Sequence, residues 1–325
     1  MESMLHNHST SSNQVVYQRI LAGVLQSRYN ISNSFRKVVS MTAQTRTVSQ
    51  IITPMRVIEG AGVLLKRSIA TRTLDYLDPF LLLDHFGSDD PADYLAGFPM
   101  HPHRGIETVT YMLAGRVTHK DSLGNHGTLG GGDVQWMTAG GGIMHEEMPE
   151  PYEGKMEGFQ LWVNLPAKLK MTKPRYQDII SADIPVVELP GGVKVRLIAG
   201  YYGVTSGAVT DIYADPTYLD VTLPPETSFS HSIPADHAVF AYLFRGNGLF
   251  GAKAIAAEAP QLVIFGDGET VKVQASTAGA RFLLVSGLPL GEPIARYGPF
   301  VMNTREEINQ ALMELRDGTF IKSSN

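Results

Sequence analysis

The sequence contains no cysteine. Disulfides, thiolate metal ligands and cysteine nucleophiles are therefore excluded, and any redox chemistry must come from a bound metal or cofactor. No apolar run reaches the roughly 18 residues that a membrane-spanning helix requires, so we expect a soluble protein. The net charge of −5 and the pI near 6.1 do not provide the basic surface that sequence-independent nucleic-acid binding needs. A phosphate-binding GxxxxGK[ST] motif is also absent.

Glycine and proline are plentiful, at 32 and 19 residues, which favours turns and short strands over long helices. At about 150 residues per domain, a chain of 325 residues suggests two domains. Two series of short apolar or β-branched runs agree with that number. The first includes GAGVLLKRSIA, LDPFLLLDHFG, DVQWMTA and GFQLWVNL, and the second includes VKVRLIAG, YLDVTL, AVFAYLFRG, QLVIFG and RFLLVSG. We therefore predict an all-β protein of two tandem barrels.

The first barrel is expected in residues 51–175 and the second in residues 176–325, with a charged, proline-bearing linker near residues 165–185. The C-terminal stretch TREEINQALMELRDG predicts a short helix. Thr304 and Glu307 form a capping box at its start. An apolar stripe on this helix is formed by Ile308, Leu312 and Leu315.

Residues 1–50 are rich in Ser, Asn, Gln and Thr and poor in acids. An Arg- and Ser-rich, acid-poor segment is typical of an organelle transit peptide. The alternative, which we favour, is a disordered tail or an upstream extension with Met41 as the natural start. The expected location is cytoplasmic in that case. A nuclear location is an alternative, and a transit peptide would make the protein organellar.

The segment from residue 98 to residue 148 contains two short histidine motifs. Side chains on a strand alternate between its two faces, so an extended HPH at residues 101–103 directs both imidazoles to one side. HEE at residues 145–147 does the same with one imidazole and one carboxylate. Facing each other, the two motifs would form a metal site of three histidines and one carboxylate. Such pairs also arise by chance, as we expect for HNH at residues 6–8.

Glu107 lies four residues after His103, and a glycine-rich turn precedes His145. This pattern resembles the two-part motif of the cupin barrel. HPHRGIETVTYMLAG, GDVQWMTAGGGIMHEEMP, GFQLWVNLP and GPFVMNT closely resemble the pirin family of bicupins, over about residues 57–315. The resemblance implies two cupin barrels of jelly-roll type and metal ligands at His101, His103, His145 and Glu147.

The resemblance also implies that the metal is Fe(II), because pirins and other cupins usually hold iron. Zinc is the chief rival, and nickel, copper or manganese are alternatives. In most cupins the glutamate after HxH is a ligand, and Glu107 has the parity to share the face of the histidines. Pirins use the carboxylate of the second motif instead, so we assign Glu147 as the ligand and Glu107 as a support for an imidazole. His119 and His126 are weaker candidates.

The second half contains GNGLFG at residues 246–251, which matches the GxGxxG pattern of dinucleotide-binding proteins. We favour a glycine-rich hairpin there, because no alternating strand and helix units surround the motif. His231 and His237 are spaced wrongly for an HxH dyad, and no histidine follows Gly266. We therefore expect a second barrel without metal ligands, in a structural or binding role.

The resemblance to pirins implies two classes of function. The first is a quercetin 2,3-dioxygenase-type oxidoreductase that acts on a flavonol-like aromatic substrate with O2, with Glu147 or Glu107 as the base. The second is a non-enzymatic, iron-dependent transcriptional co-regulator or redox sensor with a regulatory protein partner. A relic that keeps its metal without either role is a third interpretation. We favour the enzyme, as a monomer with neither nucleic acid nor membrane as a partner.

Three positions depart from the usual pirin pattern: Met100 before HPH, His85 in place of the glutamate of LDEF, and Gly141 in place of the arginine of TAGRGI. We expect these positions near the metal mouth or its surface loop. There they would affect substrate choice and partner binding more than metal binding.

Overall fold

The computed structural model describes residues 43–151 and 154–322. The described residues from Thr45 onward form one compact unit. The predicted tail or transit peptide lies outside the described residues as far as residue 42. The compact unit begins before residue 51, since Arg46 is only 2% exposed and its Nη1 donates to the carbonyl of Gly266 at 3.0 Å. No described helix is long and apolar enough to cross a membrane.

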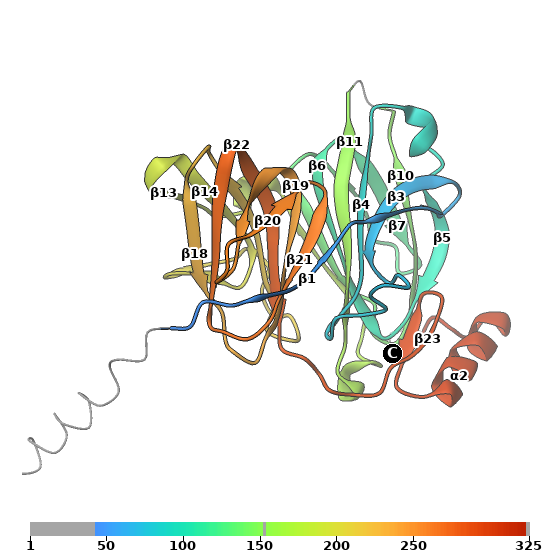
Figure 1. The fold of residues 1–325 in the computed structure, drawn as a ribbon. Helices are drawn as coiled ribbons and strands as arrows, with labels where there is room; N and C mark the ends of the chain where they lie inside the picture. Colours follow the sequence, from blue (N-terminus) through green and yellow to red (C-terminus); the bar gives the residue numbers. More distant parts are fainter. Residues whose placement is uncertain (1–42, 152–153, 323–325) are drawn as a thin grey trace, which may run out of the picture. The chain divides into compact units, whose positions relative to one another are not determined.

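The first barrel consists of two antiparallel sheets, which agrees with the predicted all-β class (Figure 1). The larger sheet has seven strands in the order β12 (Arg175–Ile179), β9 (Val134–Thr138), β6 (Ile106–Ala114), β11 (Met156–Asn164), β4 (Phe80–Ser88), β3 (Val63–Ile69) and β2 (Met55–Glu59). The smaller sheet has four strands in the order β5 (Phe98–His103), β10 (Ile143–Pro149), β7 (Val117–Asp121) and β8 (His126–Leu129). The linker prediction is wrong at residues 175–179, because β12 pairs with β9 there.

The second barrel is one antiparallel sheet of nine strands. Its main order is β1 (Val48–Ile52), β21 (Gln261–Phe265), β19 (Ala238–Phe250), β22 (Thr270–Gly287), β17 (Thr217–Leu223), β14 (Val193–Ala199) and β13 (Val186–Leu189). Two further strands, β18 (Ser228–Ser232) and β20 (Ile255–Glu258), pair with β22 and β19. Apolar side chains fill its interior, among them Val195, Val221, Ala241, Val263 and Phe282.

The hairpin interpretation of GNGLFG is confirmed. Its first five residues lie in β19, which pairs with β20 from Asn247 to Phe250. Gly246 has a φ of 69°, and a Cβ at this position would lie 2.0 Å from the carbonyl oxygen of Gly279. Glycine therefore permits a bend and a close backbone approach here, and the motif is accounted for without a nucleotide.

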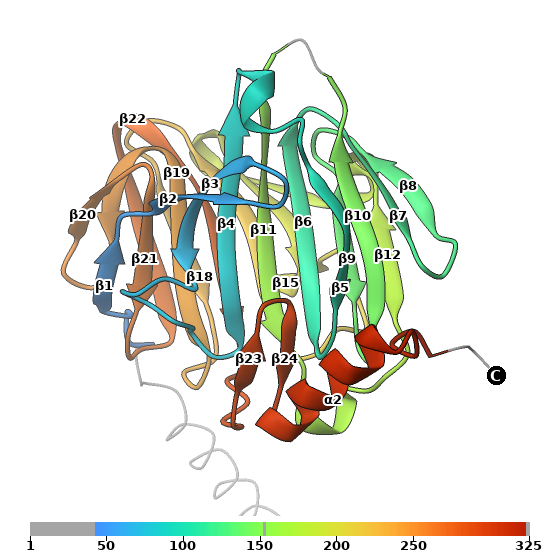
Figure 2. The ribbon, with the colours of Figure 1, turned by 90° about the vertical axis from the view of Figure 1, so that its right-hand side faces the viewer.

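Each end of the compact unit packs on the barrel that is farther from it in sequence. β1 pairs with β21 in the second barrel, whereas the C-terminal elements β23 (Ala295–Tyr297), β24 (Phe300–Met302) and α2 (Arg305–Arg316) lie beside the first barrel (Figure 2). Arg104 anchors them: it is 1% exposed, and its Nη2 donates to Glu314 Oε2 at 2.6 Å. The terminal helix thus packs on the barrel that carries the histidine motifs, not on its neighbour in sequence.

The predicted capping box of α2 is confirmed. The Thr304 Oγ1 accepts from the backbone N–H of Glu307 at 3.2 Å, and the Glu307 Oε2 accepts from the backbone N–H of Thr304 at 2.9 Å. Two donors that the helix cannot satisfy internally are satisfied in this way. The predicted stripe faces an apolar cluster that also contains Phe300 and Phe320, and it comprises Ile308, Leu312 and Leu315.

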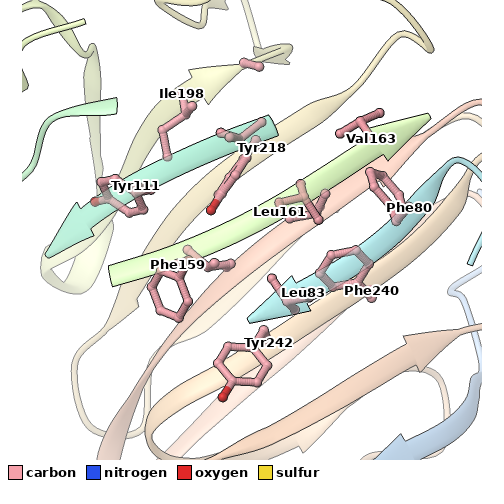
Figure 3. Packing of buried hydrophobic residues seen from close by; sticks show 14 of the residues in the cluster. Phe80, Leu83, Tyr111, Phe159, Leu161, Val163, Ile198, Tyr218, Phe240 and Tyr242 are labelled. Carbon is pink, nitrogen blue, oxygen red and sulfur yellow. The ribbon is translucent and has the colours of Figure 1, made fainter. Parts of the chain in front are cut away.

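A shared apolar core joins the two barrels (Figure 3). Alternation along β11 divides its side chains between this core and the inside of the first barrel. Phe159, Leu161 and Val163 belong to the core, while Gln160 and Trp162 line a cavity on the opposite face. The second barrel contributes residues such as Phe240, whose ring meets that of Phe80 edge-on with centroids 5.2 Å apart. The larger sheet is therefore buried on both faces.

Phe240→Ala should test the energetic weight of this shared core. Phe240 is 0% exposed, and a phenylalanine truncation in a packed core costs about 3–5 kcal/mol of unfolding free energy. Chemical denaturation with fluorescence detection should show this loss. The control Val204→Ala removes a fully exposed side chain and should change the unfolding free energy by less than about 0.5 kcal/mol. Equal effects for both variants would contradict a core between the barrels.

Candidate metal centre

The candidate site lies where β5 pairs with β10 in the smaller sheet of the first barrel. The pairing is antiparallel, and His145 lies directly opposite His101. The register shifts between His145 and Glu147, which marks a β-bulge at the end of the histidine motif. The HPH and HEE motifs therefore face each other across two neighbouring strands, the arrangement that alternation predicted.

Nitrogen atoms of three imidazoles converge at this pair of strands. One ring nitrogen from each of His101, His103 and His145 lies within 4.8 Å of the other two. The Nε2 atoms of His101 and His103 are 3.0 Å apart, and the ring centroids of His101 and His145 are 4.4 Å apart. Across residues 43–151 and 154–322, no other group of three candidate ligands is found this close together.

The protonation of these imidazoles suits a metal ion. His145 is 0% exposed, and neither of its ring nitrogens has a hydrogen-bond partner among the described residues. Burial and the nearby His101 lower the pKa of His145 to about 3, and burial also lowers the pKa of His103 well below its usual value. Neutral imidazoles with free lone pairs are the form that ligates metals. The three histidines can therefore bind a metal.

His101 is oriented by the backbone of its own strand. Its Nδ1 lies 3.0 Å from the carbonyl oxygen of Pro99. A carbonyl can only accept, so Nδ1 carries the proton, and in the neutral imidazole Nε2 then has the lone pair. The lone pair of Nε2 then lies on the side where His103 and His145 are found, which fits the same metal-binding arrangement.

Glu147, the expected fourth ligand, lines the same cavity as His101 and His103. Its Oε1 accepts a hydrogen bond from Thr110 Oγ1 at 2.9 Å. The carboxylate is outside the group of ligand atoms that lie within 4.8 Å of one another. The structure thus brings Glu147 to the site, and its coordination of a metal stays a prediction.

The structure does not bring Glu107 to the histidines. Its carboxylate is 0% exposed, accepts from Thr138 Oγ1 at 2.7 Å, and burial raises its pKa to about 7. The prediction that Glu107 shares a strand face with His103 is wrong, because the two residues lie in different sheets. Gly105, with a φ of 79°, separates them. A Cβ at Gly105 would lie 1.9 Å from the carbonyl oxygen of Val301. The chain turns at this glycine, so Glu107 shares a face with the inter-barrel core.

The remaining histidines are spread over other surroundings. His119 is buried, with its Nε2 3.6 Å from Asp178 Oδ2, and His126 is exposed. His231 and His237 lie in the second barrel, where the described residues contain no cluster of candidate ligands. None of the four belongs to the convergent group of imidazoles.

His85 does not lie at the metal mouth, contrary to the expectation from the sequence. Its Nδ1 is 3.1 Å from the hydroxyl of Tyr242 and its Nε2 is 2.9 Å from Glu157 Oε1, so it sits between the barrels. The reason is alternation along β4, which directs Asp84 to the cavity and His85 to the opposite face. Met100, by contrast, is exposed beside His101.

A cavity of about 470 Å³ inside the first barrel is lined by His101 and His103 of the histidine cluster. Its size falls within the roughly 300–1,000 Å³ of small-molecule sites. Exposed Gly60 and Gly298 lie on its lining, so the cavity opens to solvent. Its apolar walls include Leu65, Phe86, Tyr94, Phe98, Met156 and Trp162. The sequence motifs did not predict a role for the cavity-facing side of β11, which carries Trp162. Alternation within GFQLWVNL could have identified this face.

Two antiparallel barrels in one chain, with a histidine cluster in the wall of the first, define a bicupin. The family models agree with this class. Residues 62–163 match the model described as Pirin, and residues 218–321 match the model described as Pirin C-terminal cupin domain. The chain therefore belongs to the pirin family, as its motifs predicted.

Similar proteins include a Pseudomonas aeruginosa protein, PA3240, provisionally named a quercetin 2,3-dioxygenase. It is 48% identical over 278 residues, which cover 84% of this chain and 97% of that protein. A crystal structure of quercetin 2,3-dioxygenase from Acinetobacter baumannii has a TM-score of 0.78 and 36% identity, over 85% of this chain and 98% of that one. The Escherichia coli pirin YhhW, solved with nickel(II), shares the fold at a TM-score of 0.59 and 20% identity, over 74% of this chain and 99% of that one.

Replacing His103 or His145 by alanine should weaken metal binding. Loss of even a supporting partner of a metal ligand costs about 10–100-fold in affinity, so at least about tenfold weaker binding is expected in competition with a chelator. His126→Ala changes an exposed histidine outside the cluster and should bind metal like the unaltered protein. Unchanged affinity in the first two variants would show that the metal binds elsewhere.

Proposed function

We propose that this chain is a metal-dependent oxidoreductase of the quercetin 2,3-dioxygenase type, which oxidises a flavonol-like aromatic substrate with O2. The observation that carries the proposal is the open cavity beside the three histidines, with aromatic and aliphatic walls. Such walls suit a flat aromatic molecule, which they contact over its faces. The names of two relatives, at 48% and 36% identity, support the same reaction type.

In this proposal, Fe(II) is held by His101, His103, His145 and Glu147. Three neutral imidazoles and one carboxylate suit divalent transition metals in general, so zinc, nickel, copper or manganese remain alternatives. When bound, the iron would supply a Lewis acid for the substrate hydroxyl and a redox centre for O2. The protein itself supplies binding, orientation and the movement of a proton.

Glu147 is the base in the proposed reaction. Thr110 Oγ1 lies 2.9 Å from Glu147 Oε1 and 2.8 Å from Gln160 Oε1. A hydroxyl has one proton to donate, so Thr110 can satisfy both partners only if the Gln160 amide presents its NH2 group instead. Gln160 then donates to Thr110, and Thr110 donates to Glu147. This order fixes the orientation of the carboxylate, so that one oxygen can face the metal while the other accepts the proton of the substrate hydroxyl.

The regulatory alternative would be favoured by a sealed site, in which only the oxidation state of the metal reaches the surface. The cavity instead opens to solvent past Gly60 and Gly298. The position at which this alternative expects an arginine on a surface loop carries Gly141, which is buried, contrary to the expectation from the sequence. A small-molecule reaction is therefore the function that the geometry supports best.

The iron-loaded protein should consume O2 when quercetin is added, as measured with an oxygen electrode. His101→Ala should abolish this consumption, because it removes one of the three convergent imidazoles. His126→Ala should retain it. Full turnover by His101→Ala, or no O2 consumption by the iron-loaded native chain, would contradict the proposed function.

Glu147→Gln should lower kcat by about 10²–10⁴-fold, the usual contribution of a general base. The matched control is Glu146→Gln, because Glu146 is the neighbouring residue on β10 and its Oε1 pairs with Lys120 Nζ at 2.8 Å instead. Its kcat should stay close to that of the native chain. Metal content is measured in both variants, so that a loss of metal is not mistaken for a loss of the base.

A further inference from the structure

Four charged side chains form a group on the wall of the cavity. The guanidinium of Arg67 donates from Nε and Nη2 to the two carboxylate oxygens of Asp84, at 2.8 and 2.7 Å. Its Nη1 donates to Glu59 Oε1 at 2.6 Å. Arg296 lies over the ring of Trp162, with its Cζ 5.1 Å from the ring centroid. We call Glu59, Arg67, Asp84 and Arg296 the charged wall; all four line the cavity.

Some donors and acceptors of the charged wall form no hydrogen bond with the described residues. All three nitrogens of Arg67 are engaged, and both oxygens of Asp84 accept from Arg67. Among the described residues, Glu59 accepts through Oε1 alone, and Arg296 donates only from Nη1, to the carbonyl of Leu81 at 3.1 Å. Within the described residues, Glu59 Oε2 and the Nε and Nη2 of Arg296 have no protein partner. One acceptor and several donors are thus available at the cavity.

The charges of the wall restrict which ligand group can use this capacity. Two carboxylates and two guanidinium groups sum to zero, so the wall attracts neither sign of charge strongly. A carboxylate could accept from Arg296 but would be repelled by Glu59 and Asp84. An ammonium could donate to Glu59 but would be repelled by Arg67 and Arg296. A neutral hydroxyl can donate to a carboxylate and accept from a guanidinium at once. A hydroxyl is therefore the group that fits.

The charged wall is separate from the histidine cluster but belongs to the same cavity. Trp162 contacts both, because its ring centroid is 5.1 Å from that of His103 and 5.1 Å from Arg296 Cζ. No hydrogen bond joins the four charged residues to the three histidines in the described part of the chain. A ligand that occupies the cavity can thus meet the metal centre with one group and the charged wall with another.

We propose that the charged wall selects substrates that carry a hydroxyl group on the part of the aromatic skeleton remote from the metal-binding hydroxyl. This inference rests on the proposed function, since it takes a flavonol as the ligand. Glu59 accepts the hydrogen bond of that remote hydroxyl, and Arg296 donates to its oxygen. Arg67 is a positioning residue that holds Glu59 and Asp84 in place. The rest of the cavity contributes apolar contact without selecting for hydroxylation.

The test compares two ligands that share the same metal-binding end. Quercetin carries further hydroxyls, and 3-hydroxyflavone carries none beyond the one next to its carbonyl. Dissociation constants are measured by fluorescence with the zinc-loaded protein in the absence of O2, so binding is read without turnover. Glu59→Ala should weaken quercetin binding about tenfold, the value of one hydrogen bond to a charged group. Binding of 3-hydroxyflavone should change less than about twofold.

Two further variants separate recognition from damage to the fold. Glu59→Gln keeps a carbonyl acceptor and should recover part of the quercetin affinity. Glu188→Ala removes a carboxylate in the second barrel that forms a comparable ion pair, with Lys194 at 3.1 Å, and should leave both ligands unaffected. Equal losses for the two ligands in Glu59→Ala, or no loss for quercetin, would overturn the proposal.

The outcomes also separate this inference from the proposed function. Selective weakening of quercetin binding, without O2 consumption by the iron-loaded protein, would support the charged wall and reject the dioxygenase. O2 consumption with unaltered ligand preference in Glu59→Ala would do the reverse. If neither flavonol binds the native protein, both proposals are wrong.

Discussion

The burial of the seven-stranded sheet on both faces is the constraint on which the rest of the structure depends. One face packs against the second barrel, and the other lines the cavity. Because strand side chains alternate, each inner strand must supply an apolar series to the shared core and a mixed series to the cavity. β11 shows this most clearly, with Leu161 in the core and Gln160 and Trp162 in the cavity. The second barrel therefore supports the site without contributing a ligand to its histidine cluster.

The charged groups that this arrangement buries are matched by partners from distant segments. Arg104 reaches Glu314 on the terminal helix, and Lys170 Nζ donates to Asn164 Oδ1 at 2.7 Å as well as to two backbone carbonyls. Unpaired buried charges are strongly destabilising. These contacts therefore account for the return of the C-terminal segment to the first barrel, where it forms part of the cavity rim at Gly298.

Within the cavity, the chemistry is divided between two polar groups on largely apolar walls. The three histidines can bind a metal. In our proposal, Glu147 is a further ligand and the base, held by Thr110. The charged wall provides hydrogen bonds without net charge. A substrate bound by both groups would be fixed in orientation, and such positioning is a large part of what an enzyme contributes to a reaction between two bound molecules.

The all-β class, the facing HPH and HEE motifs and the capped terminal helix could all be predicted from the sequence, because each depends on period-two alternation or on residues within one turn. The positions of Glu107 and His85, by contrast, depend on contacts between distant parts of the fold. Parity counts hold within one continuous strand, and the turn at Gly105 ended the strand before Glu107. The position of His85 could not be predicted without knowing that the second barrel packs against β4. The charged wall could not be predicted from the sequence either, since Glu59, Asp84 and Arg296 are far apart in the chain and come together only in the folded structure.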